Sequence, residues 1–124
     1  MPNGSLTYRR GEIWWVNLTP VVGSETDKQR PCLILQNDLG NQKSSTTIVA
    51  PFIRGSKTYP YVVNVTPTEQ NKLDGARYIH LGQMRSVDFQ RIKNRLGILE
   101  DDYWVAIEKA ASIELGFSVV FHGA

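Results

Sequence analysis

Disulfide bonds, membrane spans and a secretion signal are all missing from this 124-residue sequence. The single cysteine, Cys32, cannot form an internal disulfide, which is typical of a reducing compartment. Hydrophobic residues make up 41% of the chain, yet no run approaches the ~18 consecutive apolar residues of a membrane-spanning helix. The first ten residues, MPNGSLTYRR, hold no apolar segment of the secretory type. We therefore expect a cytoplasmic protein with no membrane partner, in which Cys32 is a buried structural thiol.

Linkers, internal repeats and low-complexity segments are also missing, so we expect a single domain over residues 1–124 with a core of about 9–117. Charge, in contrast, is unevenly distributed. The formal net charge is +2, but residues 1–98 hold 13 of the 14 Lys and Arg and 7 of the 12 Asp and Glu, a net +6. A basic body with an acidic final segment suggests an anionic ligand, nucleic acid first. An uneven but merely solvated surface is the alternative.

Short segments rich in β-branched and aromatic residues predict six or seven strands. They cover residues 11–18, 32–36, 46–53, 61–65, 77–81 with a bulged continuation over 83–87, and 92–99. Pro51 cannot donate a ladder hydrogen bond, so we place it at a bulge or an edge. Residues 37–45 are predicted to be a turn and a polar connector.

Two helices are predicted. Thr66 and Glu69 have capping-box spacing around Pro67, which favours a short helix over 67–72. A longer helix over 103–115 would be capped by Asp101 or Asp102 and end at Gly116. The expected fold is mainly β (α+β): a small antiparallel barrel with a short internal helix and a C-terminal helix.

The loop from Thr19 to Pro31 is the most distinctive segment. A dozen residues is longer than the usual ~4–6 residue connection, and loops of that length are often functional. It contains Ser24, Glu25 and Arg30, the residue types that phosphate chemistry uses. It leads into the apolar strand that begins at Cys32.

Three stretches resemble the MazF/PemK family of toxin endoribonucleases from bacterial toxin–antitoxin modules. They are RGEIWWVNLTPVVGSETDKQRPCLILQND, TTIVAPFI and GQMRSVD, and they occur in the family's order across residues 9–117. The resemblance implies an SH3-like barrel that acts as a homodimer and cuts single-stranded RNA at short sequence motifs without a metal or cofactor. The RNA's own 2′-OH would attack the adjacent phosphorus, leaving a 2′,3′-cyclic phosphate and a 5′-OH. An acidic antitoxin protein would be the partner that restrains it.

Proton transfer and charge stabilisation are then the protein's tasks. Arg30 matches the family's catalytic arginine, and its planar donors suit phosphate oxygens. Glu25 matches the acid of the GSE motif and would relay a proton or orient Arg30; a solvated loop acid is the alternative. Ser24 can donate to a phosphate, although Ser after Gly is also ordinary turn chemistry. Gln83 matches the family's glutamine, for which we expect an RNA contact or a structural role.

Two positions depart from the family. Many members carry a hydroxyl-bearing threonine where this chain has Ile53, and an acid where it has Gly82. His80 lies two residues before Gly82 and titrates near neutrality, so it is a candidate catalytic residue as well as a candidate structural one. Arg30 would then work with His80, Ser24 or Ser56, unless the substitutions weaken catalysis.

Single-stranded RNA recognition also needs stacking faces and cations. The candidates are Tyr59, Tyr61 and Tyr78 for bases, and Arg54, Ser56, Lys57 and Arg85 for the backbone. Trp14 and Trp15 point to opposite faces of their strand, so we expect at least one to leave the core, where a second subunit or an antitoxin would bury it.

Two competing functions stay open beside the endoribonuclease. A catalytically impaired relative could act as an antitoxin- or RNA-binding module, and Ile53 and Gly82 motivate that alternative. A DNA-binding barrel of similar charge is the other, and it would not depend on a 2′-OH.

Overall fold

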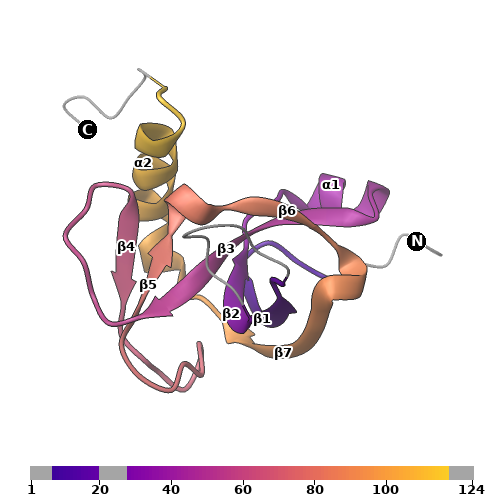
Figure 1. Cartoon of the computed structure of the whole chain (residues 1–124), viewed down its shortest axis with the longest axis horizontal. Helices are drawn as coiled ribbons and strands as arrows, with labels where there is room; N and C mark the ends of the chain where they lie inside the picture. Colours follow the sequence, from indigo (N-terminus) through magenta and orange to yellow (C-terminus); the bar gives the residue numbers. More distant parts are fainter. Residues whose placement is uncertain (1–6, 20–27, 118–124) are drawn as a thin grey trace.

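The computed structural model describes residues 7–19 and 28–117, in which seven strands form one curled antiparallel sheet (Figure 1). The strands are β1 (Glu12–Asn17), β2 (Gln29–Ile34), β3 (Thr46–Arg54), β4 (Val62–Val65), β5 (Arg77–His80), β6 (Arg85–Asp88) and β7 (Ile92–Ile98). Their order is β4-β5-β3-β2-β1-β7, and β6 pairs with β3 outside this path. Helix α2 (Trp104–Glu114) stands beside β4 at one end, and the short helix α1 (Asp38–Lys43) lies at the other. The mainly β fold with a short internal helix and a C-terminal helix is confirmed.

Strand β3 connects the two halves of the sheet because it changes neighbours along its length. Its first half pairs with β6 as far as Val49, and its last three residues, from Phe52, pair with β5. Pro51 lies between these two partners, opposite Cys32 of β2. A residue without an N–H is tolerated at such a gap in the ladder, which explains the proline in a central strand.

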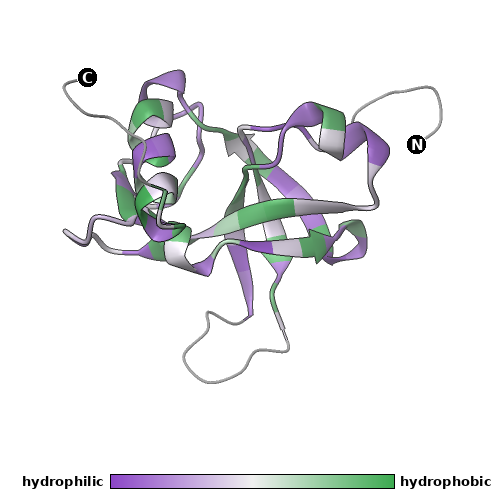
Figure 2. Ribbon diagram, turned by 90° about the horizontal axis from the view of Figure 1, so that it is seen from above, coloured by the Kyte–Doolittle hydropathy of each residue, from purple (hydrophilic) through white to green (hydrophobic). Residues whose placement is uncertain are grey.

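Apolar side chains form two buried clusters, one on each face of the central strands. The helix-side core comprises Ile13, Leu33, Ala50, Phe52, Val63, Val65, Leu73, Ile79, Leu81, Leu99, Ile107 and Ala110. The distal core comprises Val16, Leu18, Cys32, Ile34, Val49, Val87 and Ile92. Consecutive apolar residues of the central strands, green in Figure 2, supply the two clusters in turn: in β2, Leu33 belongs to the helix-side core, and Cys32 and Ile34 belong to the distal core. The expectation that Cys32 is buried is confirmed, since its side chain is fully inaccessible to solvent.

Strand β2 begins three residues before the predicted start. Arg30 pairs with Val16 and Pro31 with Trp15 of β1, so the prediction that both lie in the preceding loop is wrong. The reason is that β1 offers partners as far as Asn17, which extends the ladder past the proline. Arg30 is therefore held by a strand and not by a loop.

Residues 38–43 form helix α1, and the predicted turn and connector there are wrong. Asn37 caps the helix, because its side-chain oxygen accepts a hydrogen bond from the Gly40 N–H at 2.8 Å. The buried Asn41 then fixes the helix to β3 by accepting the Thr47 hydroxyl at 2.6 Å.

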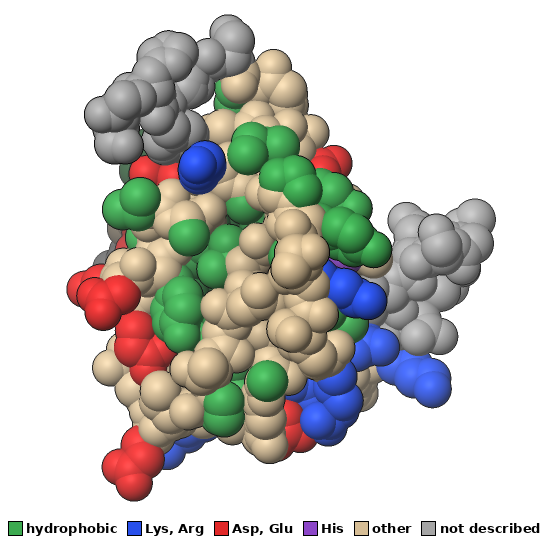
Figure 3. All heavy atoms as spheres, turned by 90° about the vertical axis from the view of Figure 1, so that its left-hand side faces the viewer, with side chains coloured by type: hydrophobic (Ala, Val, Ile, Leu, Met, Phe, Trp, Pro, Cys, Tyr) green, Lys and Arg blue, Asp and Glu red, His purple; other side chains and the backbone are tan. Residues whose placement is uncertain are grey.

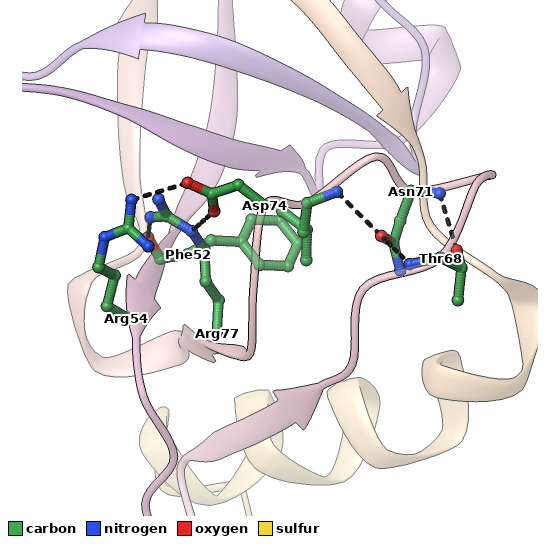
Figure 4. A network of polar contacts seen from close by, with 7 residues as sticks. Phe52, Arg54, Thr68, Asn71, Asp74 and Arg77 are labelled. Atoms are coloured by element: carbon green, nitrogen blue, oxygen red, sulfur yellow. Dashed lines mark hydrogen bonds and ion pairs between the residues drawn. The ribbon is translucent and has the colours of Figure 1, made fainter.

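The helix predicted over 67–72 does not form, so the short internal helix lies elsewhere than expected. Thr68 and Asn71 bond reciprocally, each side-chain oxygen accepting the other's backbone N–H at 3.1 and 3.0 Å (Figure 4). Lys72 then adopts a left-handed backbone with φ 58°, which ends the turn after a single helical hydrogen bond.

A 3₁₀ turn, η2 (Leu81–Gln83), separates β5 from β6, so the predicted bulge at Gly82 is wrong. The predicted caps of α2 are wrong as well, since Asp101 and Asp102 lie in a 3₁₀ turn before the helix and give no side-chain cap. Gly116 is confirmed as the C-terminal stop, with φ 75°. No helix in the described part of the chain has the length and apolar character needed to cross a membrane.

Candidate functional site

Strand register places Arg30, Ile53 and His80 on one face of the sheet. Cys32 of β2 lies opposite Pro51 of β3, and Ile53 of β3 lies opposite Tyr78 of β5. Side chains two residues apart in a strand point to the same face. This face, which we call the site face, therefore carries Arg30 from β2, Ile53 from β3, and Tyr78 and His80 from β5.

Arg30 has an unsatisfied donor. Its side chain is half-buried, and its Nε–H is buried with no hydrogen-bond acceptor among the described residues. A buried donor without an acceptor costs about 1–3 kcal/mol, and an anionic ligand would relieve that cost. Burial raises the pKa of the nearby Cys32 thiol to about 12, against the opposing charges of Arg30 and Arg85. Two guanidinium groups therefore act on this part of the site face.

A hollow of about 290 Å³ lies beside Arg30 at the end of β2. It is lined by Trp15, Lys28, Gln29, Arg30, Pro31, Arg54 and Arg77, and we call it the basic hollow. Four of these seven residues carry a positive charge, and one offers an indole face. Phosphate groups and stacked bases are what such a surface binds.

Asp74 neutralises only part of this charge (Figure 4). Its carboxylate accepts from Arg77 Nε at 3.1 Å and from Arg54 at 2.7 Å. These two hydrogen bonds, first that of Arg77, hold the pKa of Asp74 at about 2. Arg77 is buried and also donates to the Phe52 carbonyl at 3.2 Å, so it is a fixed part of the wall. Arg54 is exposed and can reorient toward a ligand.

His80 lies within an aromatic group at the end of β5. Its ring centroid is 5.4 Å from that of Tyr61 and 6.1 Å from that of Tyr78. Burial lowers the pKa of His80, and the carboxylate of Glu114 in α2 opposes this shift. Tyr59 stacks on Tyr61 at 5.4 Å and extends the aromatic surface toward solvent.

Several predicted site residues lie apart from this group. Ser24 and Glu25 fall outside the described residues. Ser56 and Lys57 are exposed in the connection from β3 to β4, where the Lys57 N–H donates to Asn64 Oδ1 at 3.0 Å. Gln83 is half-buried in η2. The RNA contacts of these residues stay predictions.

Sequence reasoning missed Lys28, Asp74, Arg77 and Glu114. Arg77 could have been found, because it shares the inward-facing alternation of the buried Ile79 and a charge at such a position needs a partner. Glu114 left no signal, since it lies 34 positions after His80 in the chain, at the end of α2. Within residues 7–19 and 28–117, no group of three His, Cys, Asp or Glu could hold a metal ion.

An apolar groove of about 530 Å³ lies between α2 and β4 (Figure 3). Its walls include Tyr59, Val62, Tyr103, Ala106, Ala110 and Ile113. Val105, Leu115 and Phe117 are further exposed apolar side chains in or just after α2, at 74, 55 and 61% exposure. Exposed apolar surface of this kind is typical of an interaction site.

Comparison with known proteins gives a consistent result. Residues 9–115 match the family described as PemK-like, MazF-like toxin of type II toxin-antitoxin system. The chain is 36% identical over 115 residues to the endoribonuclease MazF of Staphylococcus epidermidis, covering 92% of this chain and 96% of that relative.

Solved structures share the fold. MazF from Deinococcus radiodurans superimposes with a TM-score of 0.77 at 24% identity, covering 91% of this chain and all of that one. An endoribonuclease from a mycobacterial species, solved with its cognate antitoxin, gives 0.75 at 18% identity, covering 92% of this chain and all of that one. At these identities the likeness concerns the fold alone.

Proposed function

The chain belongs to the PemK-like, MazF-like family of toxins of type II toxin–antitoxin systems, and from that premise we propose how it acts as an endoribonuclease. It cleaves single-stranded RNA at short sequence motifs and needs no metal ion. The ribose 2′-OH attacks the adjacent phosphorus, the bond to the 5′ oxygen breaks, and the products are a 2′,3′-cyclic phosphate and a 5′-OH. The observation that carries this proposal is Arg30, a half-buried arginine with an unsatisfied Nε–H that lines the basic hollow together with three other cations.

Arg30 has the central role in this mechanism. The phosphorane formed on 2′-OH attack gains negative charge, and a planar guanidinium fixed by a strand offers donors to its oxygens. Ile53 has no hydroxyl to help, so proton transfer is assigned to other groups. His80 on the same face and Glu25 and Ser24 of the preceding loop are the candidates.

RNA binding is assigned to the surfaces on either side of Arg30. The basic hollow, with Arg54 at its exposed side, suits the phosphate backbone. Tyr61, together with Gln83 and Arg85, borders the site face and suits unpaired bases and the next phosphates. Ser56 and Lys57, in the exposed connection from β3 to β4, are assigned to contacts with the RNA backbone farther from Arg30.

Cleavage of a long unstructured RNA in EDTA tests this function. We expect fragments with 5′-OH ends that begin at one recurring sequence motif. An all-deoxy copy of the mapped target should stay intact, because the reaction needs the 2′-OH. Cutting of the deoxy copy, or dependence on added metal, would contradict the mechanism.

The alternative of an impaired relative that only binds RNA or antitoxin is motivated by Ile53 and Gly82, and the same experiment decides it. If the protein binds the RNA and no cleaved ends appear, the chain is a binding module and the endoribonuclease proposal is wrong. The proposed compartment is the cytoplasm, which contains mRNA and keeps thiols such as Cys32 reduced; cell fractionation checks it.

A homodimer and a cognate antitoxin are the proposed partners. The exposed apolar side chains along α2 support a subunit or antitoxin contact, and the basic body supports an acidic antitoxin segment. Light scattering should give twice the 14.0 kDa chain mass for the protein alone and a larger complex with antitoxin. The antitoxin complex should weaken as the salt concentration rises, since charge attraction is screened. A 14.0 kDa species that does not bind antitoxin would contradict both the homodimer and the antitoxin partner.

A further inference from the structure

Gly82 lies where two side chains from distant parts of the chain converge. A Cβ atom at this position would be 2.8 Å from His80 Cε1, 3.1 Å from His80 Nδ1 and 3.2 Å from Glu114 Oε1. The backbone of Gly82 is not in the left-handed region, so its φ does not require glycine. A side chain at this position would instead compete for space with the ends of the His80 and Glu114 side chains, which would have to shift.

His80 and Glu114 face this point without contacting each other directly. No ion pair or hydrogen bond joins the two side chains, and His80 Nδ1 is a buried nitrogen without a hydrogen-bond partner among the described residues. His80 Nδ1 lies 3.1 Å and Glu114 Oε1 lies 3.2 Å from the Cβ position at Gly82, so the two atoms are near enough for the carboxylate charge to act on the imidazole.

The electrostatics of His80 depend on this carboxylate. The titratable groups around the ring are Tyr61, Tyr78 and Glu114, and Glu114 is the one with a charge at neutral pH. Burial disfavours the imidazolium and lowers the pKa of His80, while Glu114 favours the imidazolium and raises it. The Glu114 carboxylate therefore offsets part of the effect that burial has on the ring.

We propose that Glu114 is a positioning residue that acts through His80: its carboxylate supports the imidazole as the base that accepts the 2′-OH proton, and Gly82 makes room for the pair. This inference rests on the proposed endoribonuclease chemistry. His80 shares the site face with Arg30, so base and guanidinium approach the same strand of RNA. The proton moves from the 2′-OH to the ring, the 2′ oxygen bonds to phosphorus as the bond from phosphorus to the 5′ oxygen breaks, and the leaving 5′ oxygen takes a proton from water.

Glu114→Gln tests the pair because it removes the charge and keeps the shape. The pKa of His80 should fall, because the carboxylate that favours the imidazolium is gone; Glu114 is exposed, so solvent screens part of this effect. NMR titration of the His80 ring without RNA measures this directly. The acidic limb of kcat/KM for RNA cleavage should move to lower pH by the same amount, because the ring then stays neutral at lower pH. Glu108→Gln, an exposed acid on the same helix, is the control and should move neither.

Gly82→Ala provides a second test with a steric cause. The added methyl should displace the ring or the carboxylate and lower cleavage about tenfold or more, whereas Gly75→Ala, with no atom within 4 Å, should leave cleavage unchanged. If the wild-type protein cleaves RNA while Glu114→Gln shifts neither the NMR midpoint nor the acidic limb, this inference is wrong and the endoribonuclease stands. If the wild-type protein cleaves no RNA, the proposed function fails and this inference with it.

Discussion

Replacing Arg30 with alanine should lower the rate of RNA cleavage by about 10²–10³-fold, the range for a single well-placed donor to a developing negative charge. The reason lies in how the strand presents it. Arg30 is paired with Val16 in the β1–β2 ladder, so its backbone is fixed before RNA arrives. Its buried Nε–H has no acceptor among the described residues, so contact with a phosphate oxygen breaks no existing hydrogen bond of that atom. Single-turnover cleavage of one end-labelled RNA measures the change.

Arg30→Lys separates charge from geometry. Lysine keeps the positive charge but loses the planar fork, so most of the rate should still be lost if donors must meet two phosphate oxygens. Arg95→Ala is the matched control, because Arg95 is a half-exposed arginine on β7, beyond β1 from Arg30. Its cleavage rate should stay within about twofold of wild type. Equal losses in Arg30→Ala and Arg95→Ala would show that general positive charge, and not Arg30, supports cleavage.

Arg30 could be predicted from sequence because the RP motif at a strand head is local. His80 could be nominated but not placed, since its environment is built by Tyr61, Tyr78 and Glu114 from three other positions in the chain. The basic hollow could not be predicted at all. It exists because β3 changes neighbours near Pro51, which brings Arg54 and Arg77 beside the end of β2. Long-range pairing of this kind leaves no mark in a local window of sequence.

The strands could be predicted because their signal is local in the sequence. The hollow could not, because long-range strand pairing brings its residues together. Enrichment in β-branched and aromatic residues is a local signal, and it predicts β1, β3, β4, β5 and β7 within a residue or two. The errors fell where two local signals compete. Thr66 and Glu69 have helix-start spacing, but Asn71 bonds back to Thr68 and points its amide at the Thr66 carbonyl, which stabilises a turn. The residues around Asn37 predict a turn, but the side-chain oxygen of Asn37 can also cap a helix, as it does here.

Gly97 shows a constraint that only the packed structure discloses. It lies in β7 opposite Ile13 of β1, at a register shift of that ladder. Its φ is not left-handed, so the backbone alone would accept alanine. A Cβ here would lie 2.5 Å from the Asn71 carbonyl oxygen and 2.6 Å from that of Gln70, distances that real Cβ atoms do not show.

Gly97→Ala should therefore destabilise the fold by about 3 kcal/mol, at the upper end of the range for overpacked sites. The opposing atoms are backbone and cannot rotate away. Asn71 is fully buried, and its side chain holds the loop by accepting from the Thr68 and Leu73 N–H groups. The loop is also tied to β7, since the Ile98 N–H donates to the Gln70 carbonyl at 3.1 Å. An alanine at position 97 therefore has to displace either the loop at Asn71 or the β1–β7 ladder.

Urea unfolding of Gly97→Ala beside Gly75→Ala measures this constraint. Both variants add one methyl to a glycine with ordinary φ, but nothing lies within 4 Å of the Cβ position at Gly75. Gly75→Ala should be neutral or stabilise slightly, because alanine restricts the unfolded chain. Equal stability of the two variants would show that the loop at Asn71 yields freely. A large difference would show that contact between β7 and this loop, and not backbone conformation, requires glycine at position 97.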